Sequence, residues 1–299
     1  MLIFWLFYNW KMSFLPILIF ALGWTPLDTY IPFNTWSAYS KEGAMKVLSY
    51  NIMNADFRKD GGKDIIQYIS TSGADIVCLQ EYPSNSAIAD RHLKKIYRYR
   101  EKIKITKYNY MVCMSKYPIV SHRKIDYPSK YNGSYMFRIK KGKDTLTVIN
   151  NHLESNKLNS GDKKMYTDML RMSDEEKIKH DGRHLLGKLG EAAAIRAVQA
   201  DTIASKIRQW GSRRTIVCGD FNDSPISYTY RVIKENLTDA YREKGRGPGF
   251  SYNRHLMYFR IDHILVSRDF DVHQCEVDHS IKASDHYPIW CIIETNNKQ

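Results

Sequence analysis

Short apolar runs separated by polar turns recur from about residue 46 onward and predict an α/β domain that is rich in strands. The predicted strands are 46–52, 75–81, 108–120, 134–142, 144–154, 214–220, 260–267 and 287–294. Apolar residues at helical spacing predict helices over 64–73 and over about 190–209, the second with a broad apolar face of Ile195, Val198, Ile203 and Ile207. The polar and charged segment 155–183 predicts a loop that contains a helical piece.

Polar side chains that can do chemistry stand where most of these apolar runs stop. In VCGDFNDSP, residues 217–225, Asp220 and Asn222 follow a β-branched run. Taken alone this segment is typical of a turn, because Asp, Asn, Ser and Pro gather at strand ends for turn chemistry. The same pattern repeated at several strand ends indicates one shared cleft, since rigid strands can present their terminal side chains to it. The residues concerned are Asn51, Glu81, His152, Asp220, Asn222, Asp262, Asp285 and His286.

Residues 1–24 form a separate apolar segment, interrupted by Asn9, Lys11 and Ser13. As a helix this segment would be about 36 Å long, enough to cross a bilayer core of about 30 Å. Burial of Lys11 in the membrane costs about 3 kcal/mol. The segment is compatible with a retained membrane anchor, with a signal peptide that has a small-x-small cleavage site at 21–23, or with two short membrane segments divided at 9–11.

Aromatic residues at the ends of this segment favour retention, because Trp10, Trp24 and Tyr30 are typical interfacial anchors. We therefore expect a membrane segment at 1–24, a juxtamembrane linker at 25–44 and a soluble domain at 45–299. The few lysines that flank the apolar run give too weak a bias to predict the side of the membrane.

The formal charge of +13 is concentrated between residues 91 and 143, where about sixteen Lys or Arg face only Glu101 and Asp126. Tyrosines lie among these charges, for example at 97, 99, 108, 110, 117, 127 and 131. Such a surface suits a polyanion, whether nucleic acid, anionic lipid or a phosphorylated small molecule. An ordinary solvated face with tyrosines packed in strands is equally compatible.

The five cysteines are odd in number and show no CxxC spacing. Cys78 and Cys218 lie inside apolar runs, which predicts buried free thiols rather than disulfides or a zinc site.

The candidate residues are mainly hard oxygen donors with two histidines. Carboxylate and amide oxygens suit Mg²⁺, and imidazoles can titrate near neutrality when a carboxylate orients them. A cation that offsets phosphoryl charge, a carboxylate that activates water and an imidazolium that stabilises an oxyanion together suit phosphate ester hydrolysis. Each residue alone also has a structural alternative: His152 could be a core histidine, and Asp285 could cap a turn.

Six ordered motifs carry a resemblance to a known family. They are SYN at 49–51, LQE at 79–81, NHL at 151–153, GDFN at 219–222, RIDHIL at 260–265 and SDHYP at 284–288. This series resembles the endonuclease/exonuclease/phosphatase superfamily of DNase I-like nucleases, from about Lys46 to Glu294, and the N-terminal apolar segment is similar to that of bacterial membrane-associated members. The resemblance implies an α/β (α+β) fold, a four-layered sandwich of two packed mixed β-sheets flanked by helices.

The resemblance also implies a metal site. Glu81 in LQE and Asn51 in SYN would hold a catalytic Mg²⁺ or Mn²⁺, with Asp285 on the metal side. Arg138, in the preceding strand, is a weaker candidate for a phosphate contact.

The remaining motif residues would act on the phosphate. Asp220 would position or deprotonate the attacking water, and Asn222 would steady the phosphate. His286 would contact the phosphoryl oxygens under the orientation of Asp262, while His152 would stabilise the phosphate or donate a proton.

These features predict a membrane-associated, metal-dependent phosphodiesterase or endonuclease, with residues 45–299 as the catalytic domain. Nucleic acid is favoured over a phospholipid, sphingomyelin or phosphoinositide head group because of the basic window, and no protein partner is predicted. A non-catalytic binding protein on the same fold is disfavoured, since a decayed site should have lost at least one metal or base position.

Overall fold

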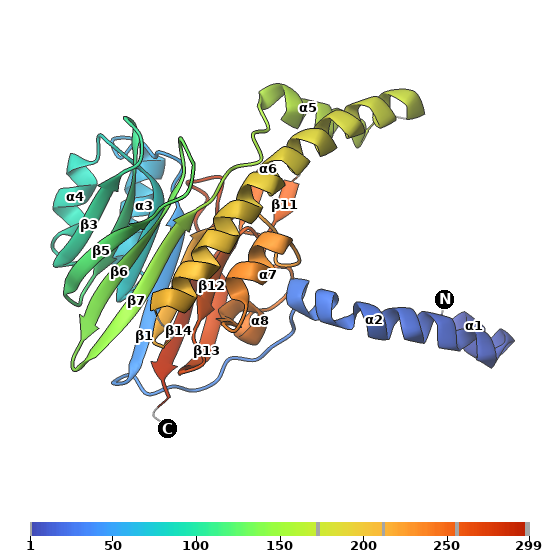
Figure 1. Ribbon diagram of the computed structural model, residues 1–299, viewed down its shortest axis with the longest axis horizontal. Helices are drawn as coiled ribbons and strands as arrows, with labels where there is room; N and C mark the ends of the chain where they lie inside the picture. The colour runs from blue at the N-terminus through green and yellow to red at the C-terminus, as the bar shows by residue number, and fades with distance from the viewer. Residues whose placement is uncertain (1, 172–173, 211–212, 255–256, 297–299) are drawn as a thin grey trace.

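Two six-stranded mixed sheets pack face to face in the computed structural model, which describes residues 2–171, 174–210, 213–254 and 257–296 (Figure 1). The first sheet has the order β13-β14-β1-β2-β4-β3, with β1 Ala44–Asn51, β2 Ile76–Pro83, β3 Tyr99–Lys104, β4 Asn109–Ser115, β13 Phe270–Val277 and β14 Ile289–Thr295. The second has the order β5-β6-β7-β8-β12-β9, with β5 Ile119–Ile125, β6 Gly133–Lys141, β7 Asp144–His152, β8 Thr215–Asp220, β9 Thr238–Asp239 and β12 Asp262–Val266. A separate hairpin joins β10 Tyr252–Arg254 to β11 Met257–Phe259.

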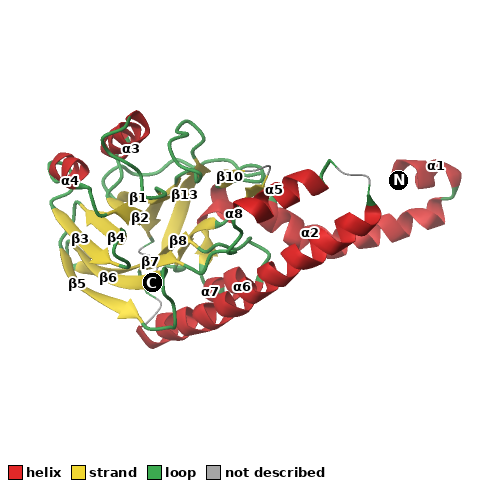
Figure 2. Ribbon diagram, turned by 90° about the horizontal axis from the view of Figure 1, so that it is seen from above, coloured by secondary structure: helices red, strands yellow, loops and turns green. Residues whose placement is uncertain are grey.

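Helices cover the outer face of each sheet (Figure 2). In chain order the helical segments are α1 Leu2–Tyr8, η1 Trp10–Ser13, α2 Phe14–Tyr30, α3 Asp60–Thr71, α4 Ala87–Leu93, α5 Ser160–Met169, α6 Glu175–Trp210, α7 Tyr228–Lys234 and α8 Ala240–Lys244. Ile69 of α3 and Leu93 of α4 pack on the first sheet, while Ile203 of α6 and Ile233 of α7 pack on the second. The structure thus confirms the four-layered α/β sandwich.

The core between the sheets is mostly apolar and contains one buried amide pair. Side chains such as Val47 and Val148 fill this space, and all five cysteines are buried and free, as predicted for Cys78 and Cys218. In the same space Gln80 Nε2 donates to Asn150 Oδ1 at 2.7 Å, and both residues are fully buried. This hydrogen bond joins β2 of one sheet to β7 of the other.

Two predicted elements differ from the structure in extent. The run 108–120 forms two strands, because the chain crosses from the first sheet to the second at Pro118, a residue that cannot donate a backbone hydrogen bond. The helix predicted over about 190–209 begins at Glu175, since Gly187 and Gly190 weaken a helix by about 1 kcal/mol each without breaking it. Strand β3, with the sequence YREKIK, was not predicted, because four of its six residues are charged and too few apolar positions remain to indicate a strand.

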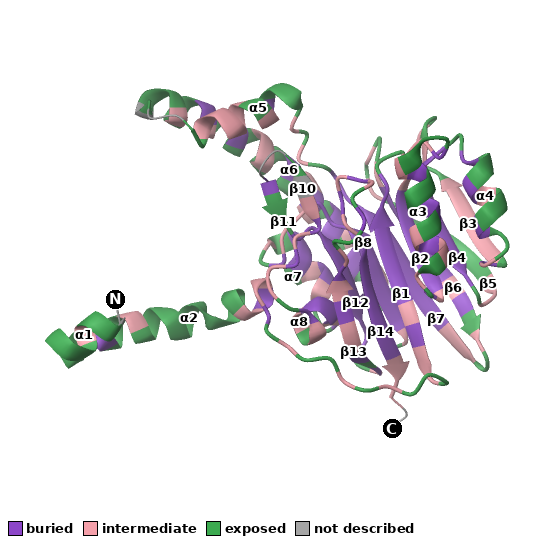
Figure 3. Cartoon of the chain, turned by 180° about the vertical axis from the view of Figure 1, so that it is seen from behind, coloured by how far each residue is buried: buried purple, intermediate pink, exposed green. Residues whose placement is uncertain are grey.

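The N-terminal helices project away from the sheets, with mostly exposed side chains (Figure 3). Helix α2 continues to Tyr30, six residues beyond the predicted boundary at 24. The segment Trp10–Tyr30 is long and apolar enough to span a membrane, a criterion that a signal sequence or a buried helix would also meet.

A buried arginine joins the end of α2 to the domain. The guanidinium of Arg260 donates to the backbone carbonyls of Thr29, Tyr30 and Pro248, the last at 2.9 Å, and lies 4.4 Å from the ring centre of Tyr241. The last carbonyls of a helix lack partners within the helix and carry partial negative charge, so a planar cation with several N–H groups suits them. The C-terminal turn of α2 is therefore part of the folded domain.

The segment 31–43, predicted to be a linker, lies along the domain. Asn34 Nδ2 donates to the carbonyl of Arg242 at 2.6 Å, and the Ser37 N–H donates to the carbonyl of His273 at 3.0 Å. An extended segment with such contacts contributes to stability, in contrast to a free tether.

We predict that a chain beginning at Met45 is less stable than a chain beginning at Trp24 by about 2–4 kcal/mol, because Arg260 and the backbone groups along 31–43 lose their partners. Urea unfolding followed by far-UV circular dichroism measures the difference. The chain from Trp24 is the matched control, since it lacks most of the exposed apolar helix and keeps the docked segment. Equal unfolding free energies would contradict the docking role of Arg260.

We also predict that Gly219→Ala destabilises the protein by about 3 kcal/mol or more. Gly219 has φ of +129°, and a Cβ there would lie 2.0 Å from the carbonyl oxygen of Asn151 on the neighbouring strand. Gly187→Ala is the control, because a Cβ at Gly187 meets no atom within 4 Å and should stabilise α6 by about 0.5–1 kcal/mol. Thermal unfolding of both variants tests this pair, and a similar small effect at both positions would refute the prediction.

Candidate active site

The carboxyl ends of β1, β2, β7 and β8 meet at one edge of the sandwich, because β1 and β2 run parallel, as do β7 and β8. Asn51, the last residue of β1, lies at the centre of this edge. Its Nδ2 donates to Asp220 Oδ2 at 3.0 Å and lies 3.4 Å from Glu81 Oε1. One amide therefore connects a carboxylate of each sheet.

His152, the last residue of β7, approaches the same two carboxylates. Its Nε2 lies 3.5 Å from Glu81 Oε1 and 3.9 Å from Asp220 Oδ2. The Glu81 side chain is 25% exposed, compared with 7% for His152 and 1% for Asp220. Glu81 is thus the most open of these three groups to an ion or ligand from solvent.

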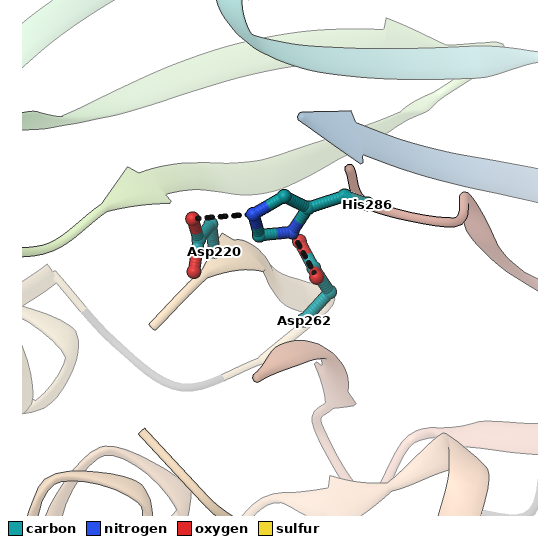
Figure 4. A group of neighbouring side chains, drawn as sticks. All are labelled: Asp220, Asp262 and His286. Carbon is teal, nitrogen blue, oxygen red and sulfur yellow. Dashed lines mark hydrogen bonds and ion pairs between the residues drawn. The ribbon is translucent and has the colours of Figure 1, made fainter. Parts of the chain in front are cut away.

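His286 lies between two buried carboxylates (Figure 4). Its Nδ1 is 2.7 Å from Asp262 Oδ2, a hydrogen bond, and its Nε2 is 3.7 Å from Asp220 Oδ2. Asp262 begins β12 and pairs directly with Asp220, because β12 runs antiparallel to β8. The prediction that these residues stand at strand exits is wrong for Asp262, Asp285 and His286, which lie at or before strand starts. Antiparallel pairing brings those starts to the same edge.

Burial and the charges within the group of Asp220, Asp262 and His286 shift the pKa of Asp220 and of His286. Burial raises the pKa of Asp220 to about 6, with His286 opposing the rise and Asp262 adding to it. Burial would lower the pKa of His286, but the carboxylates of Asp262 and Asp220 outweigh it and hold that pKa well above its usual value. At neutral pH the arrangement therefore favours a protonated imidazole beside an ionised Asp220.

Asn222 holds Asp220 in place. Its backbone N–H donates to Asp220 Oδ1 at 2.8 Å, and its Nδ2 contacts Asp220 Oδ2 at 3.2 Å and the carbonyl of Leu153 at 3.0 Å. The side-chain amide is thus directed at the carboxylate and at the end of β7.

The backbone is unusual at this edge. Glu81, Asn222 and Asn54 have φ near +50°, a left-handed conformation that residues other than glycine rarely adopt. At Glu81 the pairing of β2 with β4 is interrupted by a bulge between Leu79 and Tyr82, and Asn54 Nδ2 donates to Glu81 Oε2 at 3.0 Å. Such strain concentrates where side chains are aimed for function.

Two serines that sequence reasoning missed support the site. Ser251 Oγ accepts from the backbone N–H of Ile261 and of Asp262, both at 3.0 Å. Ser284 Oγ donates to the carbonyl of Asn51 at 2.8 Å. Ser284 could have been found from its place in SDHYP, whereas Ser251 stands in a loop with no motif to mark it.

Seven of the eight predicted residues are connected by the contacts above, and Asp285 is not. Its Oδ1 lies 3.4 Å from Ser284 Oγ, and within the described part of the chain it has no hydrogen bond to Glu81 or Asn51. Arg138 lies within β6, where its Nη1 donates to Thr147 Oγ1 at 2.6 Å. Arg138 is therefore a strand arginine outside the site.

The residues fit a hard divalent cation at Glu81. Asp220, Asp262 and His286 also have ligand atoms within 4.8 Å of one another, but a cation there would compete with the hydrogen bond between His286 and Asp262. Glu81 offers carboxylate oxygens that are partly open to solvent, and Asn51 Oδ1 accepts one hydrogen bond, from the Met53 N–H, and retains a lone pair. Oxygen donors with open positions are the environment that Mg²⁺ and Mn²⁺ prefer.

Known proteins share this arrangement of strands. D. rerio TDP2 in complex with a single-strand DNA product has 14% identity and a TM-score of 0.59 over 84% of this chain and 99% of its own. Sphingomyelinase C from Streptomyces griseocarneus has 17% identity and a TM-score of 0.56 over 85% and 99%. An endonuclease/exonuclease/phosphatase from Bacteroides vulgatus has 18% identity and a TM-score of 0.59 over 84% and 99%. At these identities the likeness establishes the fold alone.

No curated protein matches the chain in sequence. The model of the Endonuclease/Exonuclease/phosphatase family matches residues 48–286, which include all eight predicted site residues. The chain therefore belongs to the endonuclease/exonuclease/phosphatase family of phosphoester hydrolases.

Proposed function

We propose that this chain is a divalent-metal-dependent phosphodiesterase that cleaves nucleic acid while attached to a membrane by its N-terminal helix. The observation that carries the proposal is the surroundings of Asp220. This buried carboxylate has a raised pKa, two amides hold it, and two imidazoles lie within 4 Å of it. A base beside imidazole donors suits attack of water on a phosphodiester.

Each residue has a distinct task in this mechanism. Asp220, ionised above about pH 6, accepts the proton of the attacking water. Protonated His286 donates from Nε2 to a phosphoryl oxygen, while Asp262 holds its Nδ1–H. His152, whose Nε2 lies 3.9 Å from the same oxygen of Asp220, supplies a second donor.

Glu81 and Asn51 would hold Mg²⁺ or Mn²⁺. Asp285, which precedes His286 in the chain, would be a further metal ligand. When bound, the cation offsets charge on the phosphoryl group and acts as a Lewis acid. Asn54 keeps the Glu81 carboxylate oriented through its hydrogen bond to Oε2.

Charge supports nucleic acid as the substrate. Within the basic window, Lys104, Lys107, Arg123 and Lys124 are exposed on or beside the edge strands β3 and β5. Some lysines of the window are paired, Lys102 with Asp90 and Lys116 with Asp75, and Lys124 itself lies 3.6 Å from Asp126. Charges on edge strands also prevent unwanted strand pairing. The polyanion surface is therefore smaller than the sequence count indicates, and it still suits a phosphate backbone.

We predict that the full chain with Mg²⁺ cleaves a single-stranded oligonucleotide and that Asp220→Asn lowers kcat by about 10²–10⁴-fold, because the variant cannot accept a proton. Gel-based cleavage assays measure this. Asp271→Asn is the control and should keep full activity, because Asp271 is exposed and is in register with Glu294, at the end of β14 away from the site. Full activity of Asp220→Asn would refute the mechanism, and cleavage only of sphingomyelin or phosphoinositide in vesicles would refute the choice of substrate.

We further predict that Glu81→Gln raises the Mg²⁺ concentration for half-maximal activity by about tenfold or more, with activity recovering at high Mg²⁺. His286→Ala should instead lower kcat at saturating Mg²⁺ and leave the half-maximal concentration nearly unchanged, because it contacts phosphate rather than metal. Mg²⁺ titrations of both variants separate these roles. The same response in both would show that the assignment of metal and phosphate contacts is wrong.

A further inference from the structure

The charged segment 155–183 builds an arm beside the candidate site. Helix α5 and the first turns of α6 extend beyond the sheets (Figure 1). The other half of α6 packs on the second sheet through residues such as Ile203. Between the two halves, Arg196 Nη1 donates to the carbonyl of Glu154 at 3.0 Å and to Asn156 Oδ1 at 2.8 Å. The arm is thereby fastened to the chain that leaves His152.

One buried carboxylate fixes α5 on α6. Asp162 closes the N-terminus of α5 in a capping box with Asn159, and its oxygens accept from His184 Nε2 at 3.0 Å and Lys188 Nζ at 2.6 Å. The Lys188 hydrogen bond, followed by the Asn159 N–H, lowers the pKa of Asp162 to about 2, so the carboxylate stays ionised at neutral pH. The residue that follows, Lys163, therefore has a defined position.

The ring of Tyr252 lies between Lys163 and the site. Lys163 Nζ lies 3.2 Å from Tyr252 Oη and 5.8 Å from the centre of the Tyr252 ring. The Tyr252 ring in turn lies edge-on to His286, with ring centres 5.3 Å apart. Lys163, Tyr252 and His286 thus form a continuous row that begins on the arm and ends at the catalytic edge.

The backbone holds Tyr252 at this place. Tyr252 and His286 form an antiparallel bridge, and the Tyr287 N–H donates to the carbonyl of Ser251 at 2.7 Å. Ser251 also binds the N–H of Asp262. The segment that carries Tyr252 is therefore tied to both residues of the His286–Asp262 pair.

The ammonium of Lys163 is available to an anion. Among the residues that the structure describes, its only polar side-chain contact is the phenol of Tyr252, and it has no ion pair. Lys188, on the facing helix, is by contrast committed to Asp162. A cation paired only with a phenol beside a phosphate-hydrolysing site is suited to a second phosphate.

We propose that Lys163 and Tyr252 form a subsite for the nucleotide next to the cleaved bond, with Tyr252 against its sugar or base and Lys163 on its phosphate. This proposal rests on the proposed function. The order of an imidazole for the reacting phosphate, an aromatic ring and then a cation matches the order of phosphate, nucleoside and phosphate along a strand. A lipid head group with a single phosphate would leave Lys163 without a partner, so the row favours a polynucleotide.

The test compares substrates that differ by one phosphate. The full chain in detergent is assayed with the dinucleotide TpT, which has one phosphodiester, and with its 5′-phosphorylated form pTpT and its 3′-phosphorylated form TpTp. We expect kcat/KM to be about tenfold higher for one of the two substrates with a second phosphate. Lys163→Gln should remove this gain and leave the value for TpT nearly unchanged.

Lys164→Gln is the matched control, because Lys164 is the next residue of α5 and is exposed. It changes the net charge equally and should keep the gain. Tyr252→Ala should lower kcat/KM for all of these substrates, and Tyr252→Phe, which keeps the ring, should recover most of the loss. An equal loss in Lys163→Gln and Lys164→Gln, or no gain in the wild type, overturns the subsite.

Binding provides a readout that does not depend on catalysis. Fluorescence anisotropy of labelled oligothymidylate in EDTA should show weaker binding for Lys163→Gln than for Lys164→Gln, with a salt dependence lower by about one phosphate contact. If Lys163→Gln binds more weakly but the wild type hydrolyses none of these substrates, the proposed function is refuted and the subsite is supported. Equal binding by both variants, or a Lys163 effect only on phosphoinositide vesicles, would refute the nucleotide subsite.

Discussion

The hydrogen bond between Gln80 and Asn150 determines how the two sheets lie on each other beneath the site. Asn150 also donates to the carbonyls of Leu79 and Val112, which belong to the opposite sheet. A buried amide without partners costs about 1–3 kcal/mol, so sliding one sheet over the other would be penalised several times. Glu81 directly follows Gln80, and His152 lies two residues after Asn150. The contact therefore sets the spacing between the site residues of the two sheets.

Above this contact, the site combines features that would destabilise an ordinary core. Asp220, Asp262 and His286 are buried charges, and Glu81 and Asn222 have left-handed backbones. Hydrogen bonds from the amides of Asn51 and Asn222 to Asp220 compensate for part of this cost, and the position of one imidazole between two carboxylates compensates for more. The side chains are consequently held in place before any ligand arrives, which is the condition for electrostatic stabilisation of a transition state.

The N-terminal helix and the arm are both fastened to the same region. Arg260 binds the end of α2, and two residues later Asp262 binds His286, so one short segment links the N-terminal helix to the site. On the other side, Arg196 and Asp162 hold the arm that carries Lys163. Both attachments use buried charges with several hydrogen bonds each. The position of the site relative to the N-terminal helix and to the arm is therefore defined by the fold.

The fold class, most strands and the candidate site residues could be predicted from the sequence, because runs of apolar residues and ordered strand-end motifs such as GDFN are local patterns. The sequence did not determine the division of 108–120 between two sheets, the early start of α6 or the docking of 31–43, since these depend on partners distant in the chain. The same holds for Asp262 and His286, which meet Asp220 only through antiparallel pairing. Tyr252 and Lys163 lie in segments without any motif, and only the tertiary structure places them beside His286, because a side chain's neighbours across space leave no periodic signal in sequence.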